Sequence, residues 1–178
     1  MLITASYDTL HGYIKKSAEK KLYTSIHFRQ EGESAYKEYD PLRVEAVIAE
    51  SFSLISYRIR LNNMDQYIFL KKVYDGNMTL YTSRLEYGSE SLNDNQDLFF
   101  VEIEDGLIIQ LHEKYLIRTL KAIFNDSDCT LSRIDVEKFN YYYYKESKLI
   151  DLFVAYDACQ KPELALSARP MNPRLIRP

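Results

Sequence analysis

Residues 98–124, LFFVEIEDGLIIQLHEKYLIRTLKAIF, contain both kinds of secondary structure that we expect in this chain. Two apolar runs, 98–104 and 107–111, flank Asp105-Gly106, a dipeptide that favours a two-residue type I′ turn between antiparallel strands. From Glu113 onward, apolar residues recur at every third and fourth position, which is the period of an amphipathic helix. The stretch therefore predicts a β-hairpin that is followed directly by a helix.

Strand patterns continue from this stretch toward the N-terminus. Residues 22–28 and 54–61 alternate between apolar and polar side chains, which is typical of half-buried strands. A weaker strand is expected at 44–48, after a proline that suits a turn or a strand start. A second hairpin is expected between 66–74 and 78–84, because Gly76 would supply the positive φ of a tight turn.

Helical patterns dominate the last third of the chain. We expect helices over residues 113–125, 130–137 and 145–158, the last with an apolar stripe that contains Leu149, Leu152, Phe153 and Tyr156. Four of the five prolines lie after residue 161, so residues 161–178 should form an extended tail.

The order of these elements decides the fold class. Strands precede helices without the alternation of strand and helix that builds a parallel sheet. We therefore expect an α+β fold: an antiparallel β-sheet of about six to eight strands over residues 22–111, followed by two or three helices packed on one face or end. Residues 1–160 should form a single domain.

Charge and hydropathy exclude several classes of partner. The chain has 23 Lys and Arg against 26 Asp and Glu, a net charge of −3, so no overall positive field would hold a nucleic acid. No apolar stretch is long enough to span a membrane as a helix. Residues 1–7 lack the basic and apolar segments of a signal peptide, which leaves a cytoplasmic location or a signal already removed.

Sequence motifs indicate no catalytic, metal-binding or cofactor-binding residue. His11, His27 and His112 lie in different elements without ligand spacing, and the scarcity of glycine leaves no phosphate-binding loop. No serine lies in a nucleophile motif. Residues 126–137 overlay a calcium loop in part, but Leu131 stands where the loop needs glycine, so a helix-end turn is expected. Residues 93–97 could hold a hard cation, but they are more typical of a solvated loop.

Sixteen tyrosines are unusual for a chain of this length without tryptophan. Tyr141, Tyr142 and Tyr143, in a run with Tyr144, could offer ring faces to sugars or bases. The alternative is that such a run alternates between the core and its rim. We take Tyr141, Tyr142 and Tyr143 as the candidate binding surface.

The chain also resembles a group of uncharacterised Bacteroidetes envelope proteins over residues 12–160. The resemblance rests on the following residues, in order: Ile26-His27-Phe28, Tyr39-Asp40-Pro41, Val44, Phe69-Leu70, Gly76, Leu80-Tyr81, Cys129, Tyr144, Leu149 and Tyr156-Asp157-Ala158-Cys159. Asp157 departs from the group, which has asparagine there. In some of these proteins the domain precedes an outer-membrane barrel. The group has no established activity to carry over.

The resemblance implies a compartment and a covalent link. In that group the two cysteines would pair, so Cys129 and Cys159 are expected to form a disulfide, which is a feature of oxidising compartments. The protein would then be periplasmic, in the outer envelope or secreted, and otherwise cytoplasmic. Tyr39, Tyr81, Tyr144 and Tyr156 fall at positions of the group's pattern and are interpreted as structural.

Two main functional hypotheses remain open at this point. The first is a non-enzymatic envelope or secreted domain that binds a protein, peptide or glycan partner. The alternative is a cytoplasmic enzyme or small-ligand-binding protein whose polar groups converge only in the fold. A weaker third hypothesis is a lipid-binding cup formed by the curved sheet and the helices.

Overall fold

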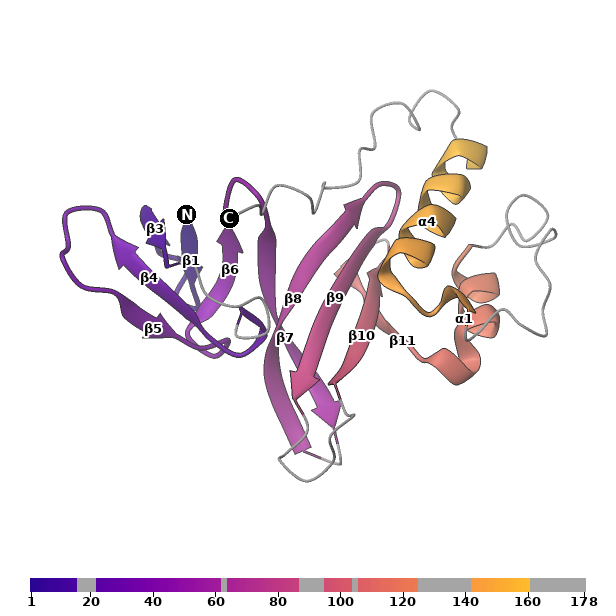
Figure 1. Cartoon of the computed structure of the whole chain (residues 1–178), viewed down its shortest axis with the longest axis horizontal. Helices are drawn as coiled ribbons and strands as arrows, with labels where there is room; N and C mark the ends of the chain where they lie inside the picture. The colour runs from indigo at the N-terminus through magenta and orange to yellow at the C-terminus, as the bar shows by residue number, and fades with distance from the viewer. Residues whose placement is uncertain (16–21, 62–63, 87–94, 104–105, 125–141, 161–178) are drawn as a thin grey trace. The chain divides into compact units, whose positions relative to one another are not determined.

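The structure is a computed structural model that describes residues 1–15, 22–61, 64–86, 95–103, 106–124 and 142–160 (Figure 1). The chain divides into two compact units. The first consists of Met1–Lys72 and Ser83–Gln96, and the second of Val73–Thr82 and Asp97–Pro178. A single domain over residues 1–160 stays a prediction, and the expected tail 161–178 lies outside the described residues.

The strands form two sheets. The larger has eight strands in the order β11-β10-β9-β8-β7-β6-β1-β2, and the smaller has three in the order β3-β4-β5. The strands are β1 (Leu2–Thr4), β2 (Thr9–Leu10), β3 (Gly12–Ile14), β4 (Ile26–Gln30), β5 (Lys37–Tyr39), β6 (Val44–Ile48), β7 (Ser53–Leu61), β8 (Met64–Asp75), β9 (Thr79–Glu86), β10 (Asn95–Glu102) and β11 (Ile108–Leu111).

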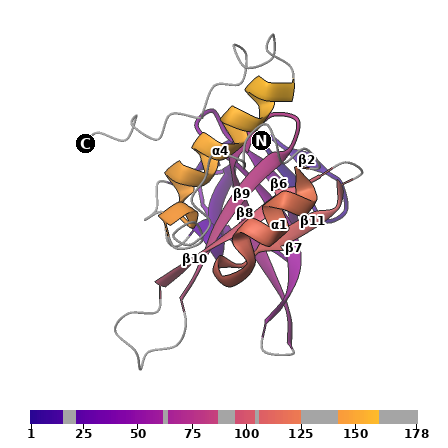
Figure 2. The same ribbon diagram turned by 90° about the vertical axis from the view of Figure 1, so that its right-hand side faces the viewer.

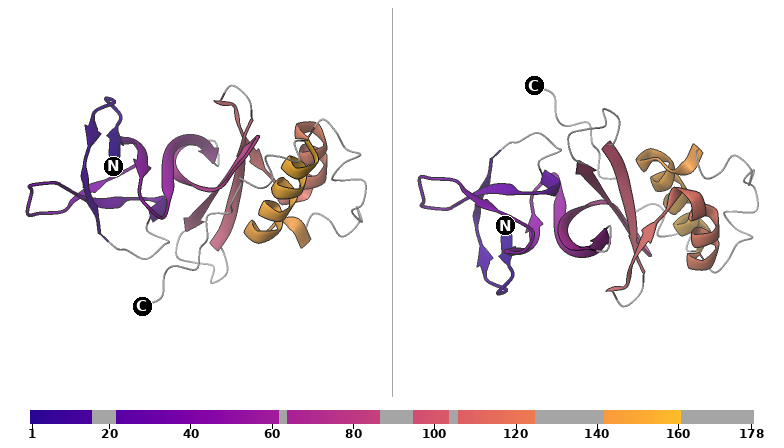
Figure 3. Two further views of the ribbon diagram at one scale, coloured as in Figure 1. Left: turned by 90° about the horizontal axis from the view of Figure 1, so that it is seen from above. Right: turned by 90° about the horizontal axis from the view of Figure 1, so that it is seen from below.

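The helices follow the strands in the chain. A 3-10 turn, η3 (Glu113–Tyr115), leads into α1 (Leu116–Ile123), and α4 (Glu146–Gln160) ends the described chain. In the second unit, α1 and α4 lie on the same side of β9, β10 and β11 (Figure 2), and the views from above and below agree (Figure 3). The α+β class and the large antiparallel sheet are therefore confirmed.

Each unit has its own apolar core. In the first unit the buried residues come from β1, β4, β6, β7 and β8: Leu2, Ile26, Phe28, Val44, Val47, Leu54 and Phe69. In the second unit the helix residues Leu116, Leu120, Phe124, Leu149, Leu152 and Phe153 pack on strand residues that include Phe99, Val101 and Leu111. The apolar period of α1 buries the face that the sequence predicts, with Leu116 and Leu120 fully covered.

The sheet departs from expectation in two respects. A single sheet over residues 22–111 is wrong, because β3, β4 and β5 form a separate sheet and strands begin at Leu2. The N-terminal strands have only two or three residues each, too few to show a period in the sequence. The strand expected from residue 22 begins at Ile26, and the helix expected at 130–137 lies outside the described residues.

Both predicted hairpins form, but their turns differ from expectation. Gly76 does not adopt a positive φ, unlike Gly106, whose φ is +75°. In the β10–β11 hairpin, Glu102 pairs with Ile108, and the Ile103 N–H donates to the Leu107 carbonyl at 3.0 Å. That register leaves three residues between Ile103 and Leu107, so the expected two-residue turn is wrong. Three-residue loops commonly end in a left-handed residue, the place that Gly106 occupies.

Candidate binding face

The three-stranded sheet of the first unit has two chemically different faces. Ile26 and Phe28 of β4 are buried in the core, and Ile14 and Tyr39 from the flanking strands pack against the same core. Because side chains alternate along a strand, the residues between them point to the opposite face. We call this opposite face the outer face and define it by His11, Tyr13, Lys15, His27, Arg29, Glu31, Tyr36 and Glu38.

One cross-strand row on the outer face brings together two tyrosines and an arginine. Tyr13 of β3 pairs with Arg29 of β4, and Tyr36 immediately precedes β5, in which Lys37 pairs with Phe28. The Arg29 guanidinium carbon lies 5.0 Å from the centre of the Tyr13 ring and 5.3 Å from that of the Tyr36 ring. Tyr13 is 54% exposed and Tyr36 40% exposed. The cation is thus held between two solvent-facing rings that come from strands on either side of β4.

The charge of Arg29 has no protein counterion in the part of the chain that the structure describes. No carboxylate there forms an ion pair with Arg29, and its Nε is buried without a hydrogen-bond partner. The two rings attract the guanidinium through their negative faces, but they do not neutralise it. A planar cation in this state can bind an oxyanion through its terminal nitrogens.

The rows beside Arg29 are polar. The backbone N–H of Lys15 donates to the His27 carbonyl, and His27 lies opposite Glu38. On the other side, the Glu31 N–H donates to the His11 carbonyl. The outer face therefore combines charged, imidazole and phenol groups and contains no aliphatic side chain.

Close packing beneath the outer face sets how closely the β3 backbone approaches β4 at Arg29. A Cβ on Gly12 would lie 2.1 Å from the Arg29 carbonyl oxygen and 2.8 Å from the Phe28 ring. Only glycine allows β3 to approach β4 so closely. The residues around Gly12 show no alternation of apolar and polar side chains. The position of Tyr13 beside Arg29 could therefore not be predicted from the sequence.

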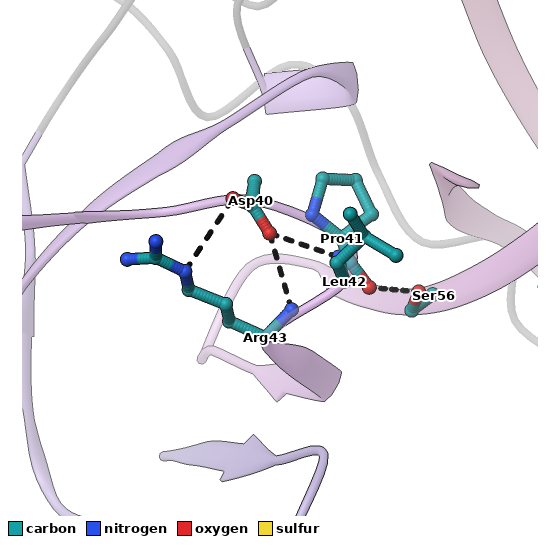
Figure 4. A network of polar contacts seen from close by, with 5 residues as sticks. All are labelled: Asp40, Pro41, Leu42, Arg43 and Ser56. Carbon is teal, nitrogen blue, oxygen red and sulfur yellow. Dashed lines mark hydrogen bonds and ion pairs between the residues drawn. The ribbon is translucent and has the colours of Figure 1, made fainter. Parts of the chain in front are cut away.

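A polar network ties the end of β5 to β7 within the first unit (Figure 4). Asp40 Oδ1 accepts hydrogen bonds from the backbone N–H groups of Leu42 at 3.0 Å and Arg43 at 3.1 Å. Arg43 Nε lies 3.6 Å from Asp40 Oδ2, and Ser56 Oγ donates to the Pro41 carbonyl. An aspartate that bonds to following backbone amides favours a tight turn. The turn leads the chain from β5 directly into β6.

The predicted binding surface lies elsewhere. Tyr141 is outside the described residues. Tyr142 is exposed, meets Tyr143 edge to face at 4.9 Å, and has Lys148 Nζ 5.3 Å from its ring centre. Tyr143 is partly buried and packs against the core of the second unit. The structure thus leaves Tyr142 as the accessible ring of the described pair, and it belongs to the unit that does not contain Arg29.

Other tyrosines of the second unit have structural contacts. The Tyr144 hydroxyl donates to the Leu111 carbonyl at 3.0 Å, and burial raises its pKa to about 12. The Tyr81 hydroxyl donates to Glu102 at 2.6 Å, and Tyr156 stacks on Phe124 with ring centres 4.3 Å apart. Burial is also the main cause that raises the pKa of Tyr81, with the Glu102 carboxylate adding to the shift.

A buried carboxylate joins α4 to the β8–β9 turn. Asp157 is 3% exposed, and its Oδ2 accepts hydrogen bonds from the Tyr74 hydroxyl at 2.6 Å and from the Asn77 N–H at 3.1 Å. A Cβ on Gly76 would lie 1.8 Å from the same oxygen. Gly76 is therefore required for close approach rather than for a positive φ. Asp157 Oδ1 has no hydrogen-bond partner among the described residues.

The histidines and cysteines do not assemble into a site in the described part of the chain. No three His, Cys, Asp or Glu residues gather there in a group that could hold a metal ion. Asn95, Gln96 and Asp97 belong to β10, so the expected solvated loop is shorter than predicted. The calcium-like segment 126–137 and Cys129 lie outside the described residues. The Cys129–Cys159 pair stays a prediction.

Among the described residues, no helix is long and apolar enough to cross a membrane. Comparisons with protein-family models, with curated proteins and with solved structures find no match for this chain.

Proposed function

We propose that this protein is a non-enzymatic binding domain whose outer face, centred on Tyr13, Arg29 and Tyr36, contacts a protein, peptide or glycan partner. The single observation that carries the proposal is that Arg29 lies between two exposed rings and has no ion pair among the described residues. Arginine and tyrosine supply much of the binding energy at interfaces, because both bring large contact areas and polar groups. Close packing at Gly12 gives this row a fixed geometry before any partner arrives.

The experiment compares the full chain with a variant in which Tyr13→Ser and Tyr36→Ser remove both rings. Both proteins are applied to a glycan array and to a peptide array that contain acidic and neutral members. We expect the native chain to bind a defined subset, and the double variant to lose at least about tenfold in affinity. Tyr67→Ser is the matched control, because Tyr67 is an exposed tyrosine of β8 in the same unit. Equal binding by the native chain and the double variant would contradict the proposal, and so would no binding to either array.

We further propose that the domain functions in an oxidising compartment, as the resemblance to Bacteroidetes envelope proteins implies. Cys159 lies in the last turn of α4. The resemblance supports its pairing with Cys129. Intact mass after alkylation, with and without reductant, tests this part. We expect no alkylation before reduction and two alkylated thiols after it, whereas two reactive thiols in native protein would overturn the assignment.

A further inference from the structure

We propose that the ligand of the outer face is an acidic polysaccharide, bound through a carboxylate that meets Arg29 between the rings of Tyr13 and Tyr36. This inference rests on the proposed function and specifies its ligand. Arg29 is flanked on both sides by ring faces at 5.0 and 5.3 Å, and no carboxylate among the described residues forms an ion pair with it.

The geometry of Arg29 selects the group that it can bind. Its Nε is buried and the residue as a whole is partly exposed, so a ligand would meet the guanidinium through its terminal nitrogens. Two terminal nitrogens in one plane match the two oxygens of a carboxylate. The flanking rings also restrict the side chain before binding, which lowers the entropic cost of fixing it on the ligand.

The surroundings of Arg29 favour a sugar over a peptide or protein surface. The centre of a protein interface is enriched in apolar contact area. The outer face has no aliphatic side chain, and its exposed rings, Tyr13 and Tyr36, both carry a hydroxyl. A pyranose presents C–H groups on its faces and hydroxyls on its rim, which suits rings that combine an apolar body with a polar tip.

The test uses polymers that differ in one property at a time. Polygalacturonate carries a carboxylate on every sugar, and the same polymer with its carboxylates methyl-esterified keeps the sugars without the charge. Poly-glutamate carries carboxylates on a peptide chain. Affinity of the full chain for each polymer is measured by affinity electrophoresis or calorimetry at low and high salt.

Three substitutions connect the affinity to Arg29. Arg29→Gln should lose at least about tenfold in affinity for polygalacturonate, because it removes the charge and the paired terminal nitrogens and keeps a polar side chain. Arg29→Lys should lose part of the affinity, since an ammonium neither pairs with two oxygens nor stacks as a plane. Arg43→Gln is the matched control, because Arg43 is an exposed arginine of the same unit that pairs with Asp40. Circular dichroism verifies that each variant is folded.

We expect the chain to bind polygalacturonate, with an affinity that weakens as salt rises. Esterification should abolish this binding. Arg29→Gln should reduce the affinity, whereas Arg43→Gln should leave it unchanged. Equal binding to the esterified polymer would overturn the acidic part of the inference. Binding to poly-glutamate without binding to polygalacturonate would overturn the glycan part, while the proposed binding function would stand. Binding to neither polymer would overturn the inference, and the array results would then decide the proposed function separately.

Discussion

At the scale of single residues, Tyr7 occupies a backbone conformation that normally belongs to glycine. The β1–β2 register pairs Ile3 with Thr9, and the Thr4 N–H donates to the Asp8 carbonyl, so Tyr7 is the last of three loop residues. Its φ is +65°, close to that of Gly106 at the same place in the β10–β11 loop. A side chain in this region costs roughly 1 kcal/mol. The ring is nevertheless 77% exposed, so this cost is not offset by burial.

Tyr7→Gly should therefore raise the free energy of unfolding by about 1 kcal/mol, because it relieves the left-handed strain without removing a buried contact. Urea denaturation measures the change. Tyr7→Ala is the control, since it removes the ring and keeps a Cβ at the same φ, and it should leave stability nearly unchanged. An equal gain in both variants would show that the exposed ring, and not the backbone, is destabilising.

Asp157 is the buried polar residue through which α4 is attached to the β8–β9 turn. Asp157→Ala leaves the Tyr74 hydroxyl and the Asn77 N–H without their acceptor, and we expect the free energy of unfolding to fall by roughly 2–4 kcal/mol. Asp151→Ala on the same helix removes an exposed carboxylate that pairs only weakly with Lys148 at 3.6 Å, so less than about 1 kcal/mol should be lost.

A double-mutant cycle with Tyr74→Phe isolates the Asp157–Tyr74 hydrogen bond. Because both groups take part in one bond, the double variant should lose less stability than the sum of the two single variants. Additive losses would mean that the carboxylate stabilises α4 by some other contact. Urea denaturation of the four proteins supplies all the values that the cycle requires.

At the scale of elements, the contact between α4 and the β8–β9 hairpin depends on the absence of a side chain at position 76. Gly76→Ala would place a Cβ 1.8 Å from Asp157 Oδ2 and 2.8 Å from the Tyr74 ring, so we expect a loss of at least about 2 kcal/mol. Gly32→Ala is the matched control. Its φ is +87° with no atom within 4 Å, so strain alone should cost about 1 kcal/mol.

The cause of the Gly76 effect can be tested in the background of Asp157→Ala. Removing the carboxylate removes the nearest clashing atom, so Gly76→Ala should cost less there than in the native chain. The measurement is again chemical denaturation. An unchanged cost would assign the effect to the backbone of the turn and not to the approach of α4.

Periodicity predicted the elements that are long enough to show it. The apolar stripe of α1 and the strand pairs around Gly76 and Gly106 follow directly from residue spacing. Strands β1, β2 and β3 have two or three residues each, and their positions depend on pairing with distant strands, which no local pattern encodes. The candidate site could not be predicted from the sequence for the same reason. Tyr13, Arg29 and Tyr36 come together only through the register of three separate strands.

At the scale of the whole molecule, five of the tyrosines fall into two groups. The exposed Tyr13 and Tyr36 belong to the first unit and form the candidate binding face, whereas Tyr74, Tyr81 and Tyr144 belong to the second unit and donate hydrogen bonds from its interior. Burial is the main cause that raises the pKa of all three interior phenols. These five tyrosines therefore serve either the candidate face or the stability of the second unit.

The raised pKa values determine how stability depends on pH at the alkaline end. The Tyr144 phenol ionises near pH 10 in the unfolded chain, but its pKa in the folded protein is about 12. Between these values the folded state binds more protons than the unfolded state, so the free energy of unfolding falls as pH rises from 10 to 12. Below pH 10 the phenol contributes its full stabilisation.

Tyr144→Phe should reduce this pH dependence. The variant loses the hydrogen bond to Leu111 and is less stable than the native chain at pH 8, by about 1 kcal/mol. Because it has no phenol to ionise at this position, its free energy of unfolding should fall less steeply between pH 10 and 12. The difference between the two slopes corresponds to up to about one proton bound by the folded state. The two stability curves should therefore converge at high pH.

Urea denaturation from pH 8 to 12 measures both curves, with Tyr142→Phe, an exposed neighbour, as the control. Curves that stay parallel throughout would show that the Tyr144 phenol ionises equally in the folded and unfolded states.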